Sequence, residues 1–235
     1  MSFDSYEFDR SMTTGQTESL GQYTAKTFLW MVLGLLITFG VAITCWLTGA
    51  VYFAYQAQLV VLIATLVLSF TMARRIERMT VGTAISMFVA FSALFGLTLS
   101  VYLLLFDVAS VIFCFFATAL YFGALAAYGY LTRRDLSRMG TILFSGLIFL
   151  VVFGVITWFI PGFTAFDQVV CLIGIAVFLG YTAYNTQKIR AYYHYYAGFP
   201  DMLTKASIFS ALQLYLDFLN LFLYLLRFLG NRRGN

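Results

Sequence analysis

Long apolar runs separated by short polar segments fill most of the chain after its first 25 residues. A helix needs about 20 apolar residues to cross the hydrocarbon core of a bilayer. Windows of that length can be placed at residues 26–47, 52–73, 81–105, 108–131, 140–160, 166–187 and 204–229. The pattern therefore predicts an all-α membrane protein with seven transmembrane helices.

The last apolar run differs from the others because it contains a stripe of polar residues. Gln213, Asp217 and Asn220 are spaced four and three residues apart, so they share one helix face, which Ser210 and Tyr224 extend. Asp217 is the only acidic residue inside so long an apolar stretch. An ionisable group at membrane depth is costly and marks a functional site by default. The alternative is that Asp217 is a structural hydrogen-bond partner between helices.

Composition supports the membrane interpretation and excludes several other classes. The chain is 62% hydrophobic and 10% charged, whereas about a quarter of the residues in soluble domains are charged. The first residues lack the basic-then-apolar order of a signal peptide. We expect a cytoplasmic tail over residues 1–23, a single transmembrane domain over 24–230 and a short basic tail over 231–235.

Basic residues are distributed unevenly between the loops. Three follow the second span, three follow the fourth, and three lie around the connection between the sixth and seventh, whereas the loops after spans one, three and five contain none. The nine are Arg74, Arg75, Arg78, Arg133, Arg134, Arg138, Lys188, Arg190 and Lys205. By the positive-inside rule, these loops and the N-terminus are cytoplasmic. The short loops favour a bacterial inner (plasma) membrane, with an organelle membrane as the alternative.

The C-terminal end conflicts with this topology. Seven spans place it outside, yet Arg227, Arg232 and Arg233 cluster there. Either the last helix does not cross completely, or the earlier loops dictate its direction.

Other residues that could carry chemistry have simpler interpretations. Asp107 and Asp167, at the starts of the fourth and sixth spans, are expected to cap helices rather than to take up ions. His194, in the expected aromatic loop Tyr192–Tyr196, is interpreted as a bystander rather than a pH sensor. Cys45, Cys114 and Cys171 are expected to pack in apolar surroundings.

Glycines in apolar runs, namely Gly34, Gly40, Gly96, Gly146 and Gly174, fit close helix packing. We find no enzyme motif and no basic surface suited to nucleic acid.

Two motifs near the C-terminus resemble a known family. The sixth span ends in TyrAsnThrGln from Tyr184, and the seventh contains LeuTyrLeuAspPheLeuAsnLeuPhe from Leu214. With seven spans and a short polar N-terminal tail, the chain resembles the Bax inhibitor-1 family, also called the transmembrane Bax inhibitor motif family. The resemblance implies six helices surrounding a central C-terminal seventh. It also implies a calcium leak that responds to pH through a pair of Asp residues.

The chain departs from the family pattern at one of these two Asp positions. The second Asp corresponds to Asp217, but the first falls on Asn185, where the family has TyrAspThrGln. Two neighbouring carboxyl groups can share a proton, whereas an amide can bond to either protonation state of a single carboxyl. We therefore expect a weaker or displaced pH response. The second span also lacks the acid that the family tends to carry there, which leaves fewer charged oxygen ligands for calcium.

The leading hypothesis is a passive calcium leak without a resident cofactor. Asp217 would bind the cation or hold the gate, with Asn185 as its hydrogen-bond partner, Gln213 and Asn220 along the pathway, and Arg74 or Arg75 steadying the closed state. The expected partners are the lipid bilayer, calcium ions and other membrane proteins. The alternatives are a non-conducting regulator of other membrane proteins and a proton-coupled transporter in which Asp217 carries the proton.

Overall fold

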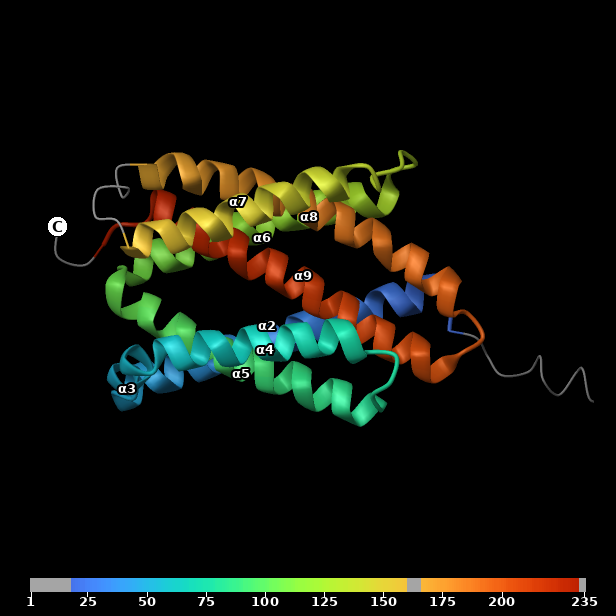
Figure 1. Cartoon of the computed structure of the whole chain (residues 1–235), viewed down its shortest axis with the longest axis horizontal. Helices are drawn as coiled ribbons and strands as arrows, with labels where there is room; N and C mark the ends of the chain where they lie inside the picture. Colours follow the sequence, from blue (N-terminus) through green and yellow to red (C-terminus); the bar gives the residue numbers. More distant parts are fainter. Residues whose placement is uncertain (1–17, 160–165, 233–235) are drawn as a thin grey trace, which may run out of the picture.

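The computed structural model describes residues 18–159 and 166–232, which form eight α-helices and no strand (Figure 1). The helices are α2 (Leu20–Thr48), α3 (Val51–Gln56), α4 (Gln58–Arg75), α5 (Val81–Leu105), α6 (Val108–Leu131), α7 (Met139–Phe159), α8 (Asp167–Tyr196) and α9 (Pro200–Leu229). All except the short α3 are long and apolar enough to cross a membrane. The prediction of an all-α protein with seven spans is confirmed.

Several of the predicted spans have different boundaries in the structure. The second span is divided at Ala57 into α3 and α4, although the sequence has neither Gly nor Pro there. The predicted aromatic loop Tyr192–Tyr196 is wrong, because these residues form the last turns of α8. Residues 181–197 contain neither Gly nor Pro, and the next residue, Gly198, has a φ of 97°. With 30 residues, α8 is about 45 Å long and extends beyond a hydrocarbon core of about 30 Å.

Helix α2 begins at Leu20, within the predicted N-terminal tail. Ser19 and Gln22 form a capping box: the Ser19 hydroxyl accepts the Gln22 N–H, and the Gln22 side chain accepts the Ser19 N–H. This exchange satisfies two amide groups that have no partner within the helix. It explains why the helix begins ahead of the apolar run.

Helix α9 is the most buried of the seven spans. In its spanning window 67% of the residues are buried, against 50% in α8. It packs against α2, α5, α6 and α8, and Figure 1 shows it running obliquely through the bundle. Helix α4 packs mainly on α5, and α7 packs on α8. The ring of six helices around a central seventh therefore stays a prediction.

Hydrogen bonds between polar side chains join α9 to its neighbours. The hydroxyls of Ser207 and Thr27 lie 3.1 Å apart, and those of Tyr215 and Thr38 lie 2.5 Å apart. Buried Lys205 donates to the backbone carbonyls that follow α4, at 3.1 Å. In a bilayer such groups have no water to replace a missing partner. They therefore hold α9 in one rotational position.

The far end of α9 is attached beside the start of α6. The N–H of Asp107 donates to the carbonyl of Asn231, whose own N–H donates to Ser110. The Asp107 carboxylate accepts the Ser110 N–H at 2.5 Å, so its predicted capping role is confirmed. Capping by Asp167 is wrong, because no side-chain bond caps α8 and the carboxylate pairs with Arg227, but its position in the first turn fits the expected interaction with the helix dipole.

The two ends of the bundle carry different charge. The connections α4–α5, α6–α7 and α8–α9 lie at the same end as the start of α2, whereas the C-terminal end of α9 lies opposite (Figure 1). The nine basic residues of the sequence analysis lie in the first two of these connections or in the adjoining parts of α4, α8 and α9. With 30 residues, α9 is long enough to cross completely. This length favours the interpretation that the earlier loops dictate its direction.

Glycines allow α2 and α5 to approach closely. A Cβ atom on Gly96 would lie 2.7 Å from the Thr38 carbonyl oxygen, and one on Gly34 would lie 2.6 Å from the Phe88 ring. Tight contacts at Gly146 and Gly174 also confirm the packing role predicted for them. Gly40 differs, because a Cβ there would meet nothing within 4 Å.

We predict that Gly96→Val lowers the free energy of unfolding by about 1–3 kcal/mol, because the added side chain overpacks the α2–α5 contact. Unfolding in mixed detergent micelles measures the change. The matched control is Gly154→Val, since a Cβ on Gly154 meets nothing within 4 Å. Equal losses in the two variants would contradict the close-approach argument.

Candidate functional site

The candidate site lies where α8 and α9 pack against each other. These helices form the most extensive helix pair in the part of the chain that the structure describes. Residues 197–199 join them, and Gly198 takes the positive φ that this short turn requires. The tight antiparallel connection places the middle of α9 beside the second half of α8.

Asn185 of α8 and Asp217 of α9 meet at this contact. The side-chain Nδ2 of Asn185 donates to Oδ2 of Asp217 at 2.7 Å, which is a normal hydrogen-bond length. The two residues are 6% and 4% exposed, so water cannot readily replace either partner. The pair expected from the sequence is therefore formed, with an amide in place of the first carboxyl.

A cavity of about 450 Å³ opens beside this hydrogen bond, and we call it the α7–α9 cleft. Its lining comes from three helices: Gly140, Phe144 and Leu147 of α7; Phe178, Tyr181, Tyr184, Asn185 and Lys188 of α8; and Gln213, Leu216, Asp217 and Asn220 of α9. The four polar residues proposed for an ion pathway thus line one cavity. The helical spacing of the polar stripe correctly indicated that Gln213, Asp217 and Asn220 share a face.

The two outer members of the predicted stripe lie elsewhere. Ser210 is buried outside the cleft lining. Tyr224 stacks on Phe178, with ring centroids 5.9 Å apart. Asn220 faces the cleft, although its amide group donates to the Leu216 carbonyl of its own helix at 2.8 Å.

The cation in the cleft is Lys188, which the sequence indicated only as a loop charge. Its ammonium group lies 5.3 Å from the ring centroids of both Tyr184 and Tyr192, close enough for cation–π attraction. Its position three residues after Asn185 was the available signal, because such residues share a helix face.

The structure does not bring Arg74 or Arg75 into the cleft. Both are exposed in the last turn of α4 and line a hollow on that helix instead. The reason is helix packing, since α4 lies mainly against α5.

Neighbouring residues in the α8 motif fix the loop between α6 and α7. The Gln187 side chain accepts the Leu136 N–H at 2.9 Å and donates to the Arg134 carbonyl at 2.7 Å. One turn later Arg190 donates to the Tyr130 carbonyl. These bonds anchor α8 on the face beside Asn185, and so they position the amide that contacts Asp217.

The cleft offers oxygen atoms but little negative charge for a metal ion. No group of three or more His, Cys, Asp or Glu side chains suitable for a metal occurs in residues 18–159 and 166–232. Asp217 supplies one carboxylate, and Asn185, Gln213 and Asn220 carry amide oxygens. Calcium takes six to eight oxygen ligands. These residues therefore fit weak binding of a cation that keeps part of its water shell.

Comparison with known proteins places these features in a family. The family model described as inhibitor of apoptosis-promoting Bax1 matches residues 20–234. Inner membrane protein YbhL of Escherichia coli strain K12 is 39% identical over 232 residues, which cover 96% of this chain and 99% of that protein. Uncharacterized protein RP147 of Rickettsia prowazekii is 38% identical over 219 residues, 92% of each chain. An uncharacterized protein of Deinococcus radiodurans is 35% identical over 226 residues, 95% of this chain and 96% of that protein.

We predict that Asn185 and Asp217 are energetically coupled. A double-mutant cycle with Asn185→Ala and Asp217→Ala should give a coupling free energy of about 0.6–1.7 kcal/mol, the range for hydrogen bonds between membrane helices. Unfolding in mixed micelles measures each variant. The control cycle pairs Asn185→Ala with Asn220→Ala, whose amide bonds within its own helix, and should be additive. Additivity in both cycles would contradict the assigned bond.

Proposed function

Because this chain belongs to the Bax inhibitor-1 family of integral membrane proteins, we propose that it is a passive calcium leak gated where α8 meets α9. The observation that carries the proposal is the buried hydrogen bond from Asn185 to Asp217 beside a cavity lined with amide and hydroxyl groups. A carboxylate at this depth is costly. We propose that the charge is kept there because it attracts a cation.

The proposed mechanism separates two contributions of the pair. The negative charge of Asp217 draws a cation into the α7–α9 cleft, where side-chain oxygens replace some of its water. The bond from Asn185 holds α8 and α9 together in the closed state. Conduction requires binding weak enough for the ion to leave again, and a single carboxylate suits that requirement.

Lys188 extends this mechanism to the closed state. Lys188 lines the same cleft as Asp217, and its positive charge repels cations. We propose that Lys188, rather than Arg74 or Arg75, lowers cation occupancy while the α8–α9 contact is closed. Movement of α8 would displace this charge together with Asn185.

We further propose a bacterial inner membrane location with the N-terminus in the cytoplasm. The basic residues in and beside the connections at the end where α2 begins support this orientation. A relative that is 39% identical is named an inner membrane protein. The proposed leak needs neither a resident cofactor nor an enzymatic step.

Calcium flux into dye-loaded proteoliposomes tests the leak. Asp217→Asn removes the charge but keeps the size of the side chain and a hydrogen-bonding partner for Asn185. We expect the flux to fall by about tenfold, equivalent to about 1.4 kcal/mol. Asn185→Ala keeps the charge and removes the bond, so its flux should rise. The control is Asp135→Asn, an exposed carboxylate in the α6–α7 connection, which should match the native chain.

The alternatives give different results in the same assay. A non-conducting regulator gives no flux above empty liposomes in any variant. A proton-coupled transporter saturates with its substrate and follows the proton gradient, whereas a leak follows the calcium gradient. Either result would overturn the proposal.

Asn185→Asp should create a stronger response of the flux to pH. At low pH two carboxyls share one proton and keep α8 and α9 joined; as pH rises, the proton leaves and the two negative charges repel. The ratio of flux at about pH 8 to flux at about pH 5 should therefore be larger in the variant than in the native chain. Identical pH profiles would refute the role assigned to the amide.

A further inference from the structure

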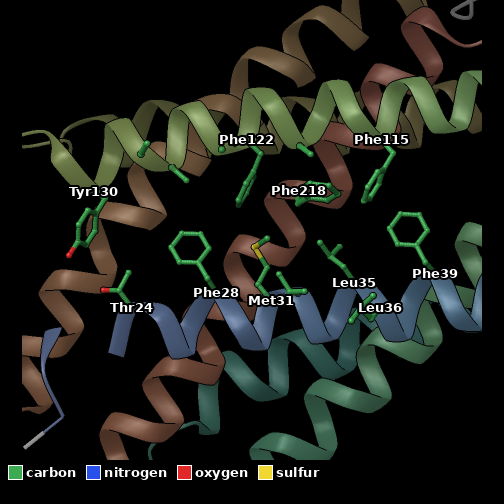
Figure 2. A pocket seen from close by; sticks show the side chains of 15 residues that line it. Thr24, Phe28, Met31, Leu35, Leu36, Phe39, Phe115, Phe122, Tyr130 and Phe218 are labelled. Atoms are coloured by element: carbon green, nitrogen blue, oxygen red, sulfur yellow. The ribbon is translucent and has the colours of Figure 1, made fainter. Parts of the chain in front are cut away.

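An apolar groove lies between α2 and α6, away from the α7–α9 cleft. Its volume is about 590 Å³, and it runs from Thr24 and Tyr130 at one end to Phe39 and Phe115 at the other. Figure 2 shows side chains of α2 and α6 facing each other across it, with Phe218 of α9 between them. We call this the α2–α6 groove.

Small residues on α6 create the space. Ala119, Gly123, Ala126 and Ala127 all line the groove. In membrane bundles such residues usually bring two helices together. Here a Cβ on Gly123 would meet nothing within 4 Å. No helix of the described chain therefore fills the space beside Gly123.

Aromatic rings close the back and one end of the groove. Phe218 packs edge-on against Phe115 and Phe122, with ring centroids 5.6 and 5.5 Å away. Phe39 and Phe115 meet edge to face at 5.0 Å and form the far end. The side away from α9 opens at the bundle surface, where Leu36 is 65% exposed. In an integral membrane protein, the neighbour of such an opening is the hydrocarbon of the bilayer.

The groove is long enough to hold a lipid chain. Thr24 and Phe39 are fifteen residues apart on α2, which is about 22 Å at about 1.5 Å per residue. One leaflet contributes about half of a hydrocarbon core of about 30 Å. An acyl chain that enters at the Tyr130 end can therefore extend along the groove to the Phe39–Phe115 contact.

Positive charge gathers at the Tyr130 end. The Arg190 guanidinium lies 5.6 Å from the Tyr130 ring centroid and donates to the Tyr130 carbonyl. Arg133 and Arg134 follow α6 immediately and are exposed. Basic groups between helices at this level of a membrane attract anionic headgroups.

We propose that the α2–α6 groove binds one acyl chain of an anionic phospholipid, with the chain against Phe218 and the headgroup beside Arg133, Arg134 and Arg190. The binding site is lateral and faces the bilayer. It does not depend on the proposed calcium leak.

Photo-crosslinking in proteoliposomes tests the site. The probe is phosphatidylglycerol with a diazirine in one acyl chain, and mass spectrometry locates the labelled peptides of the full chain. In the native protein, labelling should concentrate on α2 and α6. Gly123→Leu fills the groove without a clash. The ratio of α2–α6 labelling to α7 labelling should therefore fall about tenfold, which corresponds to a loss of about 1.4 kcal/mol in binding free energy. Ala127→Leu, at a second lining position, should do the same.

Gly154→Leu is the matched control, because Gly154 of α7 also has nothing within 4 Å of its Cβ position and lies outside the groove. It should leave α2–α6 labelling unchanged. Labelling spread evenly over all lipid-facing helices, or unaffected by both Gly123→Leu and Ala127→Leu, would overturn the site.

A second lipid probe tests whether the site recognises anionic headgroups. The same probe with a phosphatidylcholine headgroup should label α2 and α6 several-fold less. Replacement of Arg133 and Arg134 by Gln should bring phosphatidylglycerol labelling down to the phosphatidylcholine level. Equal labelling by both lipids in the native chain would overturn the recognition of anionic headgroups.

Discussion

The hydrogen bond between Asn185 and Asp217 is the interaction on which the functional interpretation of this structure depends. A bilayer offers no water to a buried polar group, so a carboxylate within α9 must find its partner inside the bundle. Asn185 supplies it at 2.7 Å. Lys205, Ser207 and Tyr215 of α9 obey the same rule, and their bonds to α2 and to the end of α4 fix the rotation of α9. That rotation directs Asp217 toward α7 and α8.

Much of this arrangement could be predicted from the sequence, because hydropathy and helical spacing are local properties. Seven apolar runs gave the seven spans, and the spacing of Gln213, Asp217 and Asn220 correctly placed them on one face. Local properties also explain some errors. The loop expected at Tyr192–Tyr196 is helical because aromatic residues do not end a helix, whereas Gly198 does.

Properties that depend on which helices pack together could not be predicted in this way. Arg74 and Lys188 carry the same charge and each directly follows a predicted span, yet only Lys188 lines the cleft. The difference arises because α8 packs on α9 whereas α4 packs on α5. The α2–α6 groove is a further example. Gly123 and Gly129 lie on the same helix, but only Gly129 is needed for a close approach, against the backbone of Ala183.

Consecutive residues of α9 connect the polar cleft to the apolar groove. Asp217 and Phe218 point about 100° apart on a helix of 3.6 residues per turn, so one contacts Asn185 while the other forms the back of the α2–α6 groove. A rotation of α9 that lengthens the hydrogen bond must also move the Phe218 ring against Phe115 and Phe122. An amide can keep its bond to either protonation state of Asp217, so protonation is a weak trigger for that rotation. The hydrogen bond at Asp217 and the packing around Phe218 therefore constrain the same rotation of α9.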